Sequence, residues 1–215
     1  MSSIKTIVIL GATGMVGQKL LKQALASERV HRVIAPTRKA LPEHPKLENP
    51  IVDFENLPNS ASWLKSDAVL CALGTTIKQA GSKKQFRHVD YDFVMHAAEL
   101  AHAAGTSCFV LNSSLGADAS SGNFYLKVKG ELERDLTALE FQSLTLIRPS
   151  LLDAGARPES RPGEQIGLWF SKRLSLIIPK RYQPIATENV ARAMLQAALI
   201  AKPGTHFVES EQLHY

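Results

Sequence analysis

Short apolar runs alternate along the chain with longer segments in which apolar residues recur at helical spacing. The segment 83–104 is the clearest helix, and Gly105 follows it as a residue that ends helices. Its inward positions are expected to be Phe86, Val89, Phe93, Ala97, Leu100 and Ala101. Further helices are expected over 18–26 and 125–139. A late helix is expected to begin at Thr187, whose side chain suits an N-cap.

The apolar runs predict strands at 4–10, 32–35, 51–54, 68–73, 107–112 and 144–147, with a last strand near 206–208. Strands that are apolar throughout are typical of a parallel sheet covered by helices on both faces. The alternation therefore predicts an α/β fold, a Rossmann-type doubly wound parallel sheet, in one domain over residues 1–215. An unrelated three-layer sheet that binds no dinucleotide has the same pattern, so the turn after the first strand must distinguish the two.

A glycine-rich turn follows the first strand directly, with glycines at 11, 14 and 17. In dinucleotide-binding folds such glycines allow a tight turn, a close approach of backbone to phosphate, and packing of the helix on the strand. The helix N-terminus adds N–H donors and a partial positive charge. We expect a pyrophosphate here, in contact with Gly11, Thr13, Gly14, Met15, Val16 and Gly17.

The end of the second strand bears on the choice of cofactor. NAD-binding chains usually carry an acidic residue about 20 residues after the glycines, on the ribose 2′-hydroxyl. Here Thr37, Arg38 and Lys39 stand at that place without a carboxylate. Arg38 with Thr37 is expected to bind the 2′-phosphate of NADP(H), although a solvated surface arginine is the alternative.

Other positions at the ends of strands are candidates for the same cofactor. Asp53 is expected to bond the adenine. Leu73, Gly74 and Thr75, after the fourth strand, are expected to lie along the ribose and pyrophosphate.

Candidate catalytic chemistry follows the fifth strand. Tyr125 and Lys129 are four residues apart, so a helix places both on one face. A cation beside a phenol favours the phenolate, which lets Tyr125 pass a proton to a carbonyl oxygen as hydride reaches the carbon. Lys129 is also expected to bond the nicotinamide ribose. Ser114 is expected to bind the carbonyl oxygen, and Ser113 to contact the cofactor.

Composition narrows the function classes. The 215 residues are 45% hydrophobic and 21% charged, with a net charge of +5. No run of five basic residues and no nucleic-acid motif occurs, so a small-molecule substrate is expected as partner, with neither nucleic acid nor membrane. No Cys/His cluster has metal-ligand spacing. The first core strand begins within a few residues without a leader-like segment, and the two cysteines, Cys71 and Cys108, fall in predicted strands as buried free thiols do, so a cytoplasmic protein is expected. The sequence leaves open whether it is a monomer or a homodimer.

The chain resembles atypical short-chain dehydrogenase/reductases, and within them the Tat-interactive protein 2 oxidoreductase family. The resemblance covers nearly the whole chain and is densest in 71–76, 89–94, 113–118, 125–131, 148–152 and 159–164. It implies NADPH binding, Tyr125 as proton donor or acceptor, Lys129 beside it, and cofactor contacts at Leu152 and Arg161. The family carries Glu-Thr at Met15-Val16, so only backbone contacts are assumed there. It carries paired arginines at Thr37-Arg38, which predicts weaker binding of the 2′-phosphate.

The segment 153–184 is expected to form the substrate side, beyond the carboxyl ends of the strands. Trp169 and Phe170 either line an apolar pocket or belong to the core. Two classes of function stay open: an NADPH-dependent reductase of a carbonyl or related substrate, and a non-catalytic NADPH-binding redox sensor. The intact pair of Tyr125 and Lys129, with Ser114, favours the enzyme. An epimerase using bound NAD is a poorer third, because the second strand lacks the carboxylate.

Overall fold

The computed structural model describes residues 5–57, 64–153 and 179–214. Seven strands form one parallel sheet in the order β3-β2-β1-β4-β5-β6-β9. Their bounds are β1 Lys5–Leu10, β2 Val30–Ile34, β3 Leu47–Glu48, β4 Ala68–Cys71, β5 Cys108–Asn112, β6 Ser143–Arg148 and β9 Gly204–Glu209. A short parallel pair, β7 (Leu152–Asp153) with β8 (Ile185–Ala186), lies apart from this sheet. The expected doubly wound sheet is confirmed.

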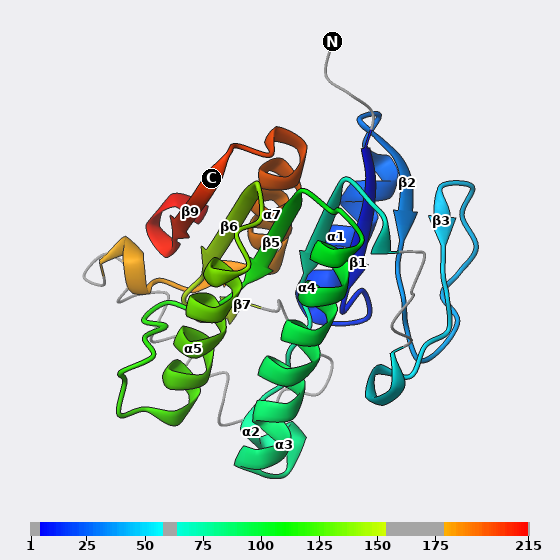
Figure 1. The fold of residues 1–215 in the computed structure, drawn as a ribbon. Helices are drawn as coiled ribbons and strands as arrows, with labels where there is room; N and C mark the ends of the chain where they lie inside the picture. The colour runs from blue at the N-terminus through cyan, green and yellow to red at the C-terminus, as the bar shows by residue number, and fades with distance from the viewer. Residues whose placement is uncertain (1–4, 58–63, 154–178, 215) are drawn as a thin grey trace, which may run out of the picture.

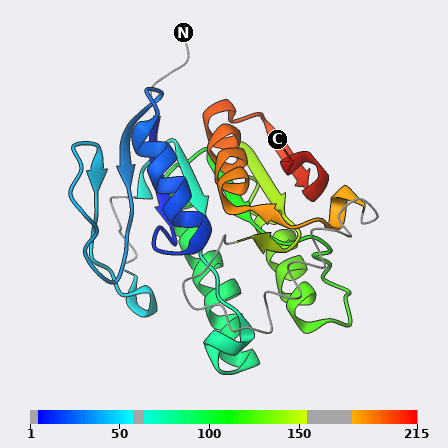
Figure 2. The ribbon, with the colours of Figure 1, turned by 180° about the vertical axis from the view of Figure 1, so that it is seen from behind.

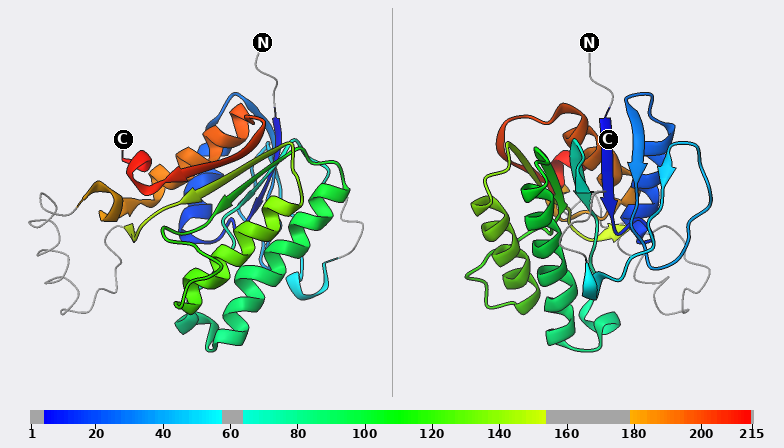
Figure 3. Two further views of the ribbon diagram at one scale, coloured as in Figure 1. Left: turned by 60° about the vertical axis from the view of Figure 1, so that its left-hand side comes forward. Right: turned by 45° about the vertical axis from the view of Figure 1, so that its right-hand side comes forward.

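Helices cover both faces of the sheet. Those visible in Figure 1 are α1 Met15–Ala26, α2 Ile77–Ala80, α3 Lys83–Arg87, α4 Phe93–Ala103, α5 Phe124–Ala138 and α7 Thr187–Ile200. Helices α4 and α5 lie on the near face in Figure 1, and α1 and α7 on the opposite face in Figure 2. The left view of Figure 3 shows the sheet between these two pairs. Three short 3₁₀ helices are also described: η1 Phe54–Asn56, η4 Lys180–Tyr182 and η5 Ser210–Leu213.

Two apolar clusters fill the spaces between the helices and the sheet. One packs α1 and α7 against the strands, with Ile7, Leu20 and Met194 fully buried. The other packs α4 and α5, with Phe109 and Leu132 fully buried. The central strands β1, β4 and β5 therefore supply apolar side chains to both faces, which is why their sequences read as continuous apolar runs. Both cysteines are free and buried. None of the helices in the described ranges is long and apolar enough to cross a membrane.

The predicted third strand at 51–54 is wrong in position. The strand beside β2 is β3, whereas Ile51 makes only an isolated bridge to Thr37 and the chain then enters η1. Pro50 has no N–H for a ladder bond, and prolines are confined to strand ends and edges. The Pro50 carbonyl accepts a hydrogen bond from the N–H of Thr37, but Pro50 cannot donate the next bond of a ladder.

The long helix predicted over 83–104 contains a π-helical turn, η3 (His88–Asp92), between α3 and α4. Val89 and Phe93 are only half-buried, whereas Asp90 and Val94 are buried. A π turn has more than four residues, so it moves the inward side of the helix along by one position. The late helix also begins differently: Ala186 is the N-cap, and Thr187 is the first helical residue.

The approach of α5 to the preceding loop depends on Gly130. A Cβ at this position would lie 2.1 Å from the Asp118 carbonyl carbon and 2.2 Å from the Ala119 nitrogen. Both atoms are backbone, so neither can move without displacing the loop.

We therefore expect Gly130→Ala to destabilise the fold by about 1–3 kcal/mol, as overpacking does. Urea unfolding followed by circular dichroism measures this change. Gly122→Ala is the control, because a Cβ there meets no atom within 4 Å. Equal free energies of unfolding of the two variants would show that the fold accommodates a side chain at residue 130 without loss of stability.

Candidate functional site

The glycine turn brings three backbone segments together at the carboxyl end of β1. Gly11 has φ +81, and a Cβ there would lie 2.6 Å from the Ala72 carbonyl oxygen. A Cβ at Gly17 would lie 2.0 Å from the Gly11 oxygen. Gly14 is the N-cap of α1, and no side chain caps this helix end. The first turn thus offers N–H donors beside an exposed glycine, an arrangement that fits a phosphate group.

The end of β2 separates the two residues expected on a 2′-phosphate. Thr37 is buried, and its hydroxyl donates to the Lys39 carbonyl at 2.6 Å and accepts from Asn49 Nδ2 at 2.8 Å. The hydroxyl proton is thus used within the loop. Arg38 is exposed and makes no hydrogen bond or ion pair with any described residue. The exposed cations Arg38 and Lys39 are therefore the side chains available to an anion here.

Asp53 caps η1 at the surface. Its carboxylate accepts from the Glu55 N–H at 3.0 Å and from Asn56 Nδ2 at 2.8 Å. These hydrogen bonds, that of Asn56 first, lower the pKa of Asp53. The carboxylate stays charged and exposed, in keeping with the expected contact to an adenine amine.

The loop after β4 is tied to the π turn. The Thr75 N–H donates to Asp90 Oδ2 at 2.7 Å, and a Cβ at Gly74 would lie 3.1 Å from Asp90 Oδ1. Gly74 itself is exposed. The backbone of residues 73–75 is thus bonded to Asp90 and exposed at Gly74. This arrangement suits a segment lying along a cofactor.

Tyr125 and Lys129 lie on α5 as the spacing predicts. The Asn123 side chain caps this helix and accepts from the N–H groups of Tyr125 and Leu126. The Tyr125 ring packs against the buried Phe86, with ring centroids 5.5 Å apart. Among the described residues its hydroxyl has no hydrogen-bond partner.

Lys129 is 4% exposed and forms an ion pair with Asp90, with 2.7 Å between Nζ and Oδ1. Burial by itself lowers the pKa of this ammonium, but the charges of Asp90 and of a Tyr125 phenolate outweigh it and raise the pKa of Lys129. The lysine is therefore a permanent positive charge that acts on the phenol. Burial also raises the pKa of the neighbouring Cys71 thiol to about 12, so the thiol is neutral and unreactive.

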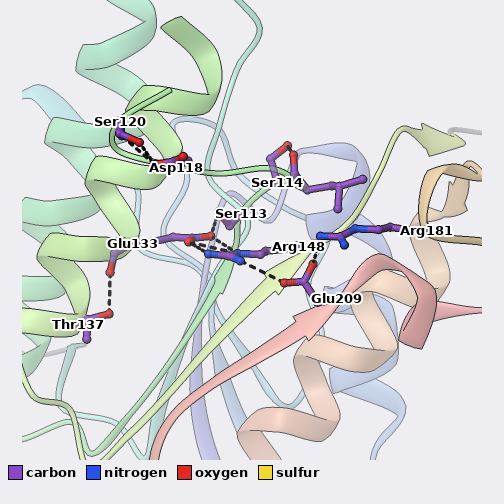
Figure 4. A network of polar contacts seen from close by, with 10 residues as sticks. Ser113, Ser114, Asp118, Ser120, Glu133, Thr137, Arg148, Arg181 and Glu209 are labelled. Atoms are coloured by element: carbon purple, nitrogen blue, oxygen red, sulfur yellow. Dashed lines mark hydrogen bonds and ion pairs between the residues drawn. The ribbon is translucent and has the colours of Figure 1, made fainter. Parts of the chain in front are cut away.

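The two serines after β5 have different surroundings, which Figure 4 shows. Ser113 is buried, and its hydroxyl donates to Glu133 Oε1 at 2.5 Å. Glu133 pairs in turn with Arg148 at 2.5 Å, and Arg148 with Glu209 at 3.1 Å. With the described residues the Ser114 hydroxyl makes one long bond, 3.3 Å, to the Leu115 carbonyl. The hydroxyl of Ser113, in contrast, belongs to a buried ionic network.

The remaining expected contacts lie at or beyond the described residues. Leu152 begins β7 and packs against the cluster under α1 and α7. Arg161, Trp169 and Phe170 lie outside the described residues, as does most of the expected substrate segment. The described ranges contain no group of three or more His, Cys, Asp or Glu side chains placed to hold a metal ion.

Sequence reasoning missed the two acids that organise this edge, Asp90 and Glu133. The sequence places Asp90 four residues after Phe86 and four before Val94, but the expected inward side of this helix, with Val89 and Phe93, left it out. A carboxylate at such a position requires a buried cation as partner. Glu133 lies one turn after Lys129 on α5 and is buried as well.

Comparison with known proteins agrees with this geometry. A family model described as NAD(P)H-binding matches residues 11–199. Protein HTATIP2 of Rattus norvegicus is 38% identical over 95% of this chain and 85% of its own length. Protein fmp52, mitochondrial, of Emericella nidulans is 32% identical over 97% of this chain and 94% of its own. Protein FMP52, mitochondrial, of Candida albicans is 36% identical over 75% of each chain. The expected resemblance to the Tat-interactive protein 2 family is confirmed.

Solved structures show the same fold at low identity. The structure "MoeE5 in complex with UDP-glucose and NAD" superposes with a TM-score of 0.70 at 16% identity, over 97% of this chain and 79% of that one. The UDP-Glc/GlcNAc 4-epimerase of Campylobacter jejuni gives 0.68 at 13% identity, over 95% and 78%. At these identities the likeness establishes the Rossmann-like fold alone.

The names of the fungal relatives overturn the expected cytoplasmic location, because several of these proteins are called mitochondrial. The expectation rested partly on Cys71 and Cys108. Both thiols are buried, so the fold shields them whatever the redox state of the compartment. Free cysteines of this kind do not report location.

Gly14 allows a test of the phosphate cradle without breaking the turn. Its φ is −76, so a side chain is not strained, and an added Cβ would lie 3.3 Å from the Gly11 oxygen. We expect Gly14→Val to fold and to lose at least ~100-fold in NAD(P)H affinity, about 2.7 kcal/mol, because the branched side chain covers the N-terminus of α1. Gly14→Ala is expected to lose less. Fluorescence titration measures the NAD(P)H affinity of both variants, and thermal unfolding measures whether they fold. Normal NAD(P)H binding by the valine variant would show that the phosphates bind elsewhere.

Proposed function

Because the chain belongs to the NAD(P)H-binding family, in the group that includes rat Protein HTATIP2, we propose that it is an NADPH-dependent oxidoreductase with Tyr125 as proton donor. The observation that carries the proposal is the pairing on α5 of a phenol without a hydrogen-bond partner in the described chain and a buried, charged lysine one turn later. An unpaired hydroxyl is available to a substrate oxygen.

The glycine turn and the loop at residues 73–75 would hold the phosphates and ribose of the cofactor, as their open backbone supports. When bound, the cofactor supplies hydride to a substrate carbon. Tyr125 then gives its proton to the substrate oxygen, and Ser114 donates a hydrogen bond that orients this oxygen. The lysine charge stabilises the phenolate left behind. The substrate class that suits this chemistry is a small carbonyl compound.

The preference for NADPH is supported by Arg38. It is exposed at the carboxyl end of β2, has no partner among the described residues, and has no acidic neighbour in 35–39. A guanidinium can donate two hydrogen bonds to a phosphate, whereas it offers nothing specific to an unmodified ribose.

Replacing Arg38 tests this preference. The parent protein is expected to bind NADPH more tightly than NADH, and Arg38→Ala to reduce that ratio by about tenfold to a hundredfold, as loss of a charged hydrogen bond does. Calorimetric titration of both cofactors gives the ratio. Lys202→Ala, a loss of positive charge before β9 at the opposite edge of the sheet, is the control and should leave the ratio unchanged. Equal affinities in the parent protein would refute the assignment.

Replacing Tyr125 distinguishes an enzyme from a redox sensor. Tyr125→Phe keeps the ring that packs on Phe86, so folding and NADPH binding should persist. Turnover should fall by about 10² to 10⁴, the usual contribution of a positioned acid. NADPH oxidation measured against a panel of aldehydes, ketones and quinones supplies the assay. A substrate that Tyr125→Phe reduces at the parent rate would exclude Tyr125 as the proton donor. NADPH binding without turnover of any compound in the panel would favour the redox sensor.

A further inference from the structure

Asp90 joins two parts of the site that are distant in the sequence. Its Oδ1 pairs with Lys129 Nζ at 2.7 Å, and its Oδ2 accepts from the Thr75 N–H at 2.7 Å. The residue is 1% exposed. One carboxylate therefore binds both the helix that carries Tyr125 and the loop after β4.

The buried carboxylate lies within the π turn η3. Phe86, Asp90 and Val94 are all buried at two successive intervals of four residues, which fits a stretch with more residues per turn than an α-helix. The exposed neighbour Asp92, in the same turn, instead accepts from His88 at the surface. π turns within α-helices are frequent at functional sites.

Further contacts fix the π turn against α5. The Arg87 guanidinium bonds Glu131 and lies 4.3 Å from the centre of the Tyr91 ring. The Tyr91 hydroxyl donates to Asp135 at 2.6 Å. The turn that carries Asp90 is therefore held against α5 by residues on both sides of it.

We propose that Asp90 is a positioning residue that keeps Lys129 charged beside Tyr125 and aligns the backbone at Thr75 with the catalytic helix. The role in catalysis rests on the function proposed above for Lys129 and for residues 73–75. The positioning itself is a property of the protein without cofactor.

The charge balance explains why the carboxylate is needed. The titratable groups that act on Lys129 in the described chain are Asp90 from η3, Tyr125 from α5 and Cys71 from β4. The Cys71 thiol is neutral, because burial raises its pKa to about 12, and the negative charge paired with Lys129 at 2.7 Å is that of Asp90. A buried ammonium without a partner loses its proton readily.

The test is the titration of Lys129 in the protein without cofactor. NMR monitors the signal of the side-chain carbon next to Nζ, and the Lys129→Arg variant assigns that signal. In the parent the midpoint should lie above the usual lysine value of about 10.4. Asp90→Asn, which keeps the size and an acceptor oxygen, should lower it by at least about one pH unit. Asp92→Asn is the matched control in the same turn and should leave it unchanged. An unchanged midpoint in Asp90→Asn would overturn the proposal.

A second readout covers the case in which Asp90→Asn is poorly folded. Thermal unfolding of Asp90→Asn, Lys129→Met and the double variant forms a cycle, because a buried pair removed together costs less than either charge left alone. We expect the double variant to be more stable than the sum of the two single losses of stability predicts. Strict additivity would show that the two groups are not coupled.

Cofactor binding separates this inference from the proposed function. At pH values above the lowered midpoint of Lys129, the NADPH affinity of Asp90→Asn should fall by tenfold or more, and below that midpoint it should fall less. The NADPH affinity of Tyr125→Phe should not fall. A parent protein that binds no NADPH would refute the proposed function, and the lysine titration would still decide the role of Asp90. Affinity independent of pH in Asp90→Asn would overturn the catalytic part of the inference.

Discussion

Charges buried at the carboxyl edge of the sheet require partners, and this requirement organises the half of the molecule that carries the candidate chemistry. Lys129 and Glu133 lie one turn apart on α5 and are almost fully buried. The lysine is paired with Asp90 of η3 and the glutamate with Arg148 of β6. Removing one member of such a pair costs about 3–5 kcal/mol, because the other charge remains in a medium that solvates it poorly. The helix with Tyr125 is thus bonded to a neighbour on each side.

The opposite face is organised by close approach of backbone instead of by charge. At Gly11 and Gly17 the turn, the strand β4 and the helix α1 meet at distances that admit no side chain. Apolar packing of α1 and α7 on the sheet holds this arrangement. The two faces therefore supply different groups at the same edge: open N–H groups from the face of α1, and fixed titratable side chains from the face of α5.

Two hydroxyls near this edge serve the fold. Thr37 and Ser113 each donate their proton within the protein, to the Lys39 carbonyl and to Glu133. The side chains of their neighbours Arg38 and Ser114 make few or no hydrogen bonds with the part of the chain that the structure describes. In both pairs one residue anchors the strand end and the adjacent one faces outward. This alternation follows from a chain leaving a buried strand, because successive side chains point to opposite sides.

The sequence by itself determined the parallel α/β fold, the nucleotide turn and the placement of Tyr125 and Lys129 on one helix face, because each depends on local spacing. Apolar runs, three glycines and an interval of four residues are readable without knowing what lies next to them. Only the tertiary structure decided that Lys129 pairs with Asp90, that the π turn buries that carboxylate, and that the edge strand is β3. These depend on contacts between segments far apart in the chain. A carboxylate on a helix is ordinarily solvated, and only the presence of a buried ammonium opposite it makes burial favourable.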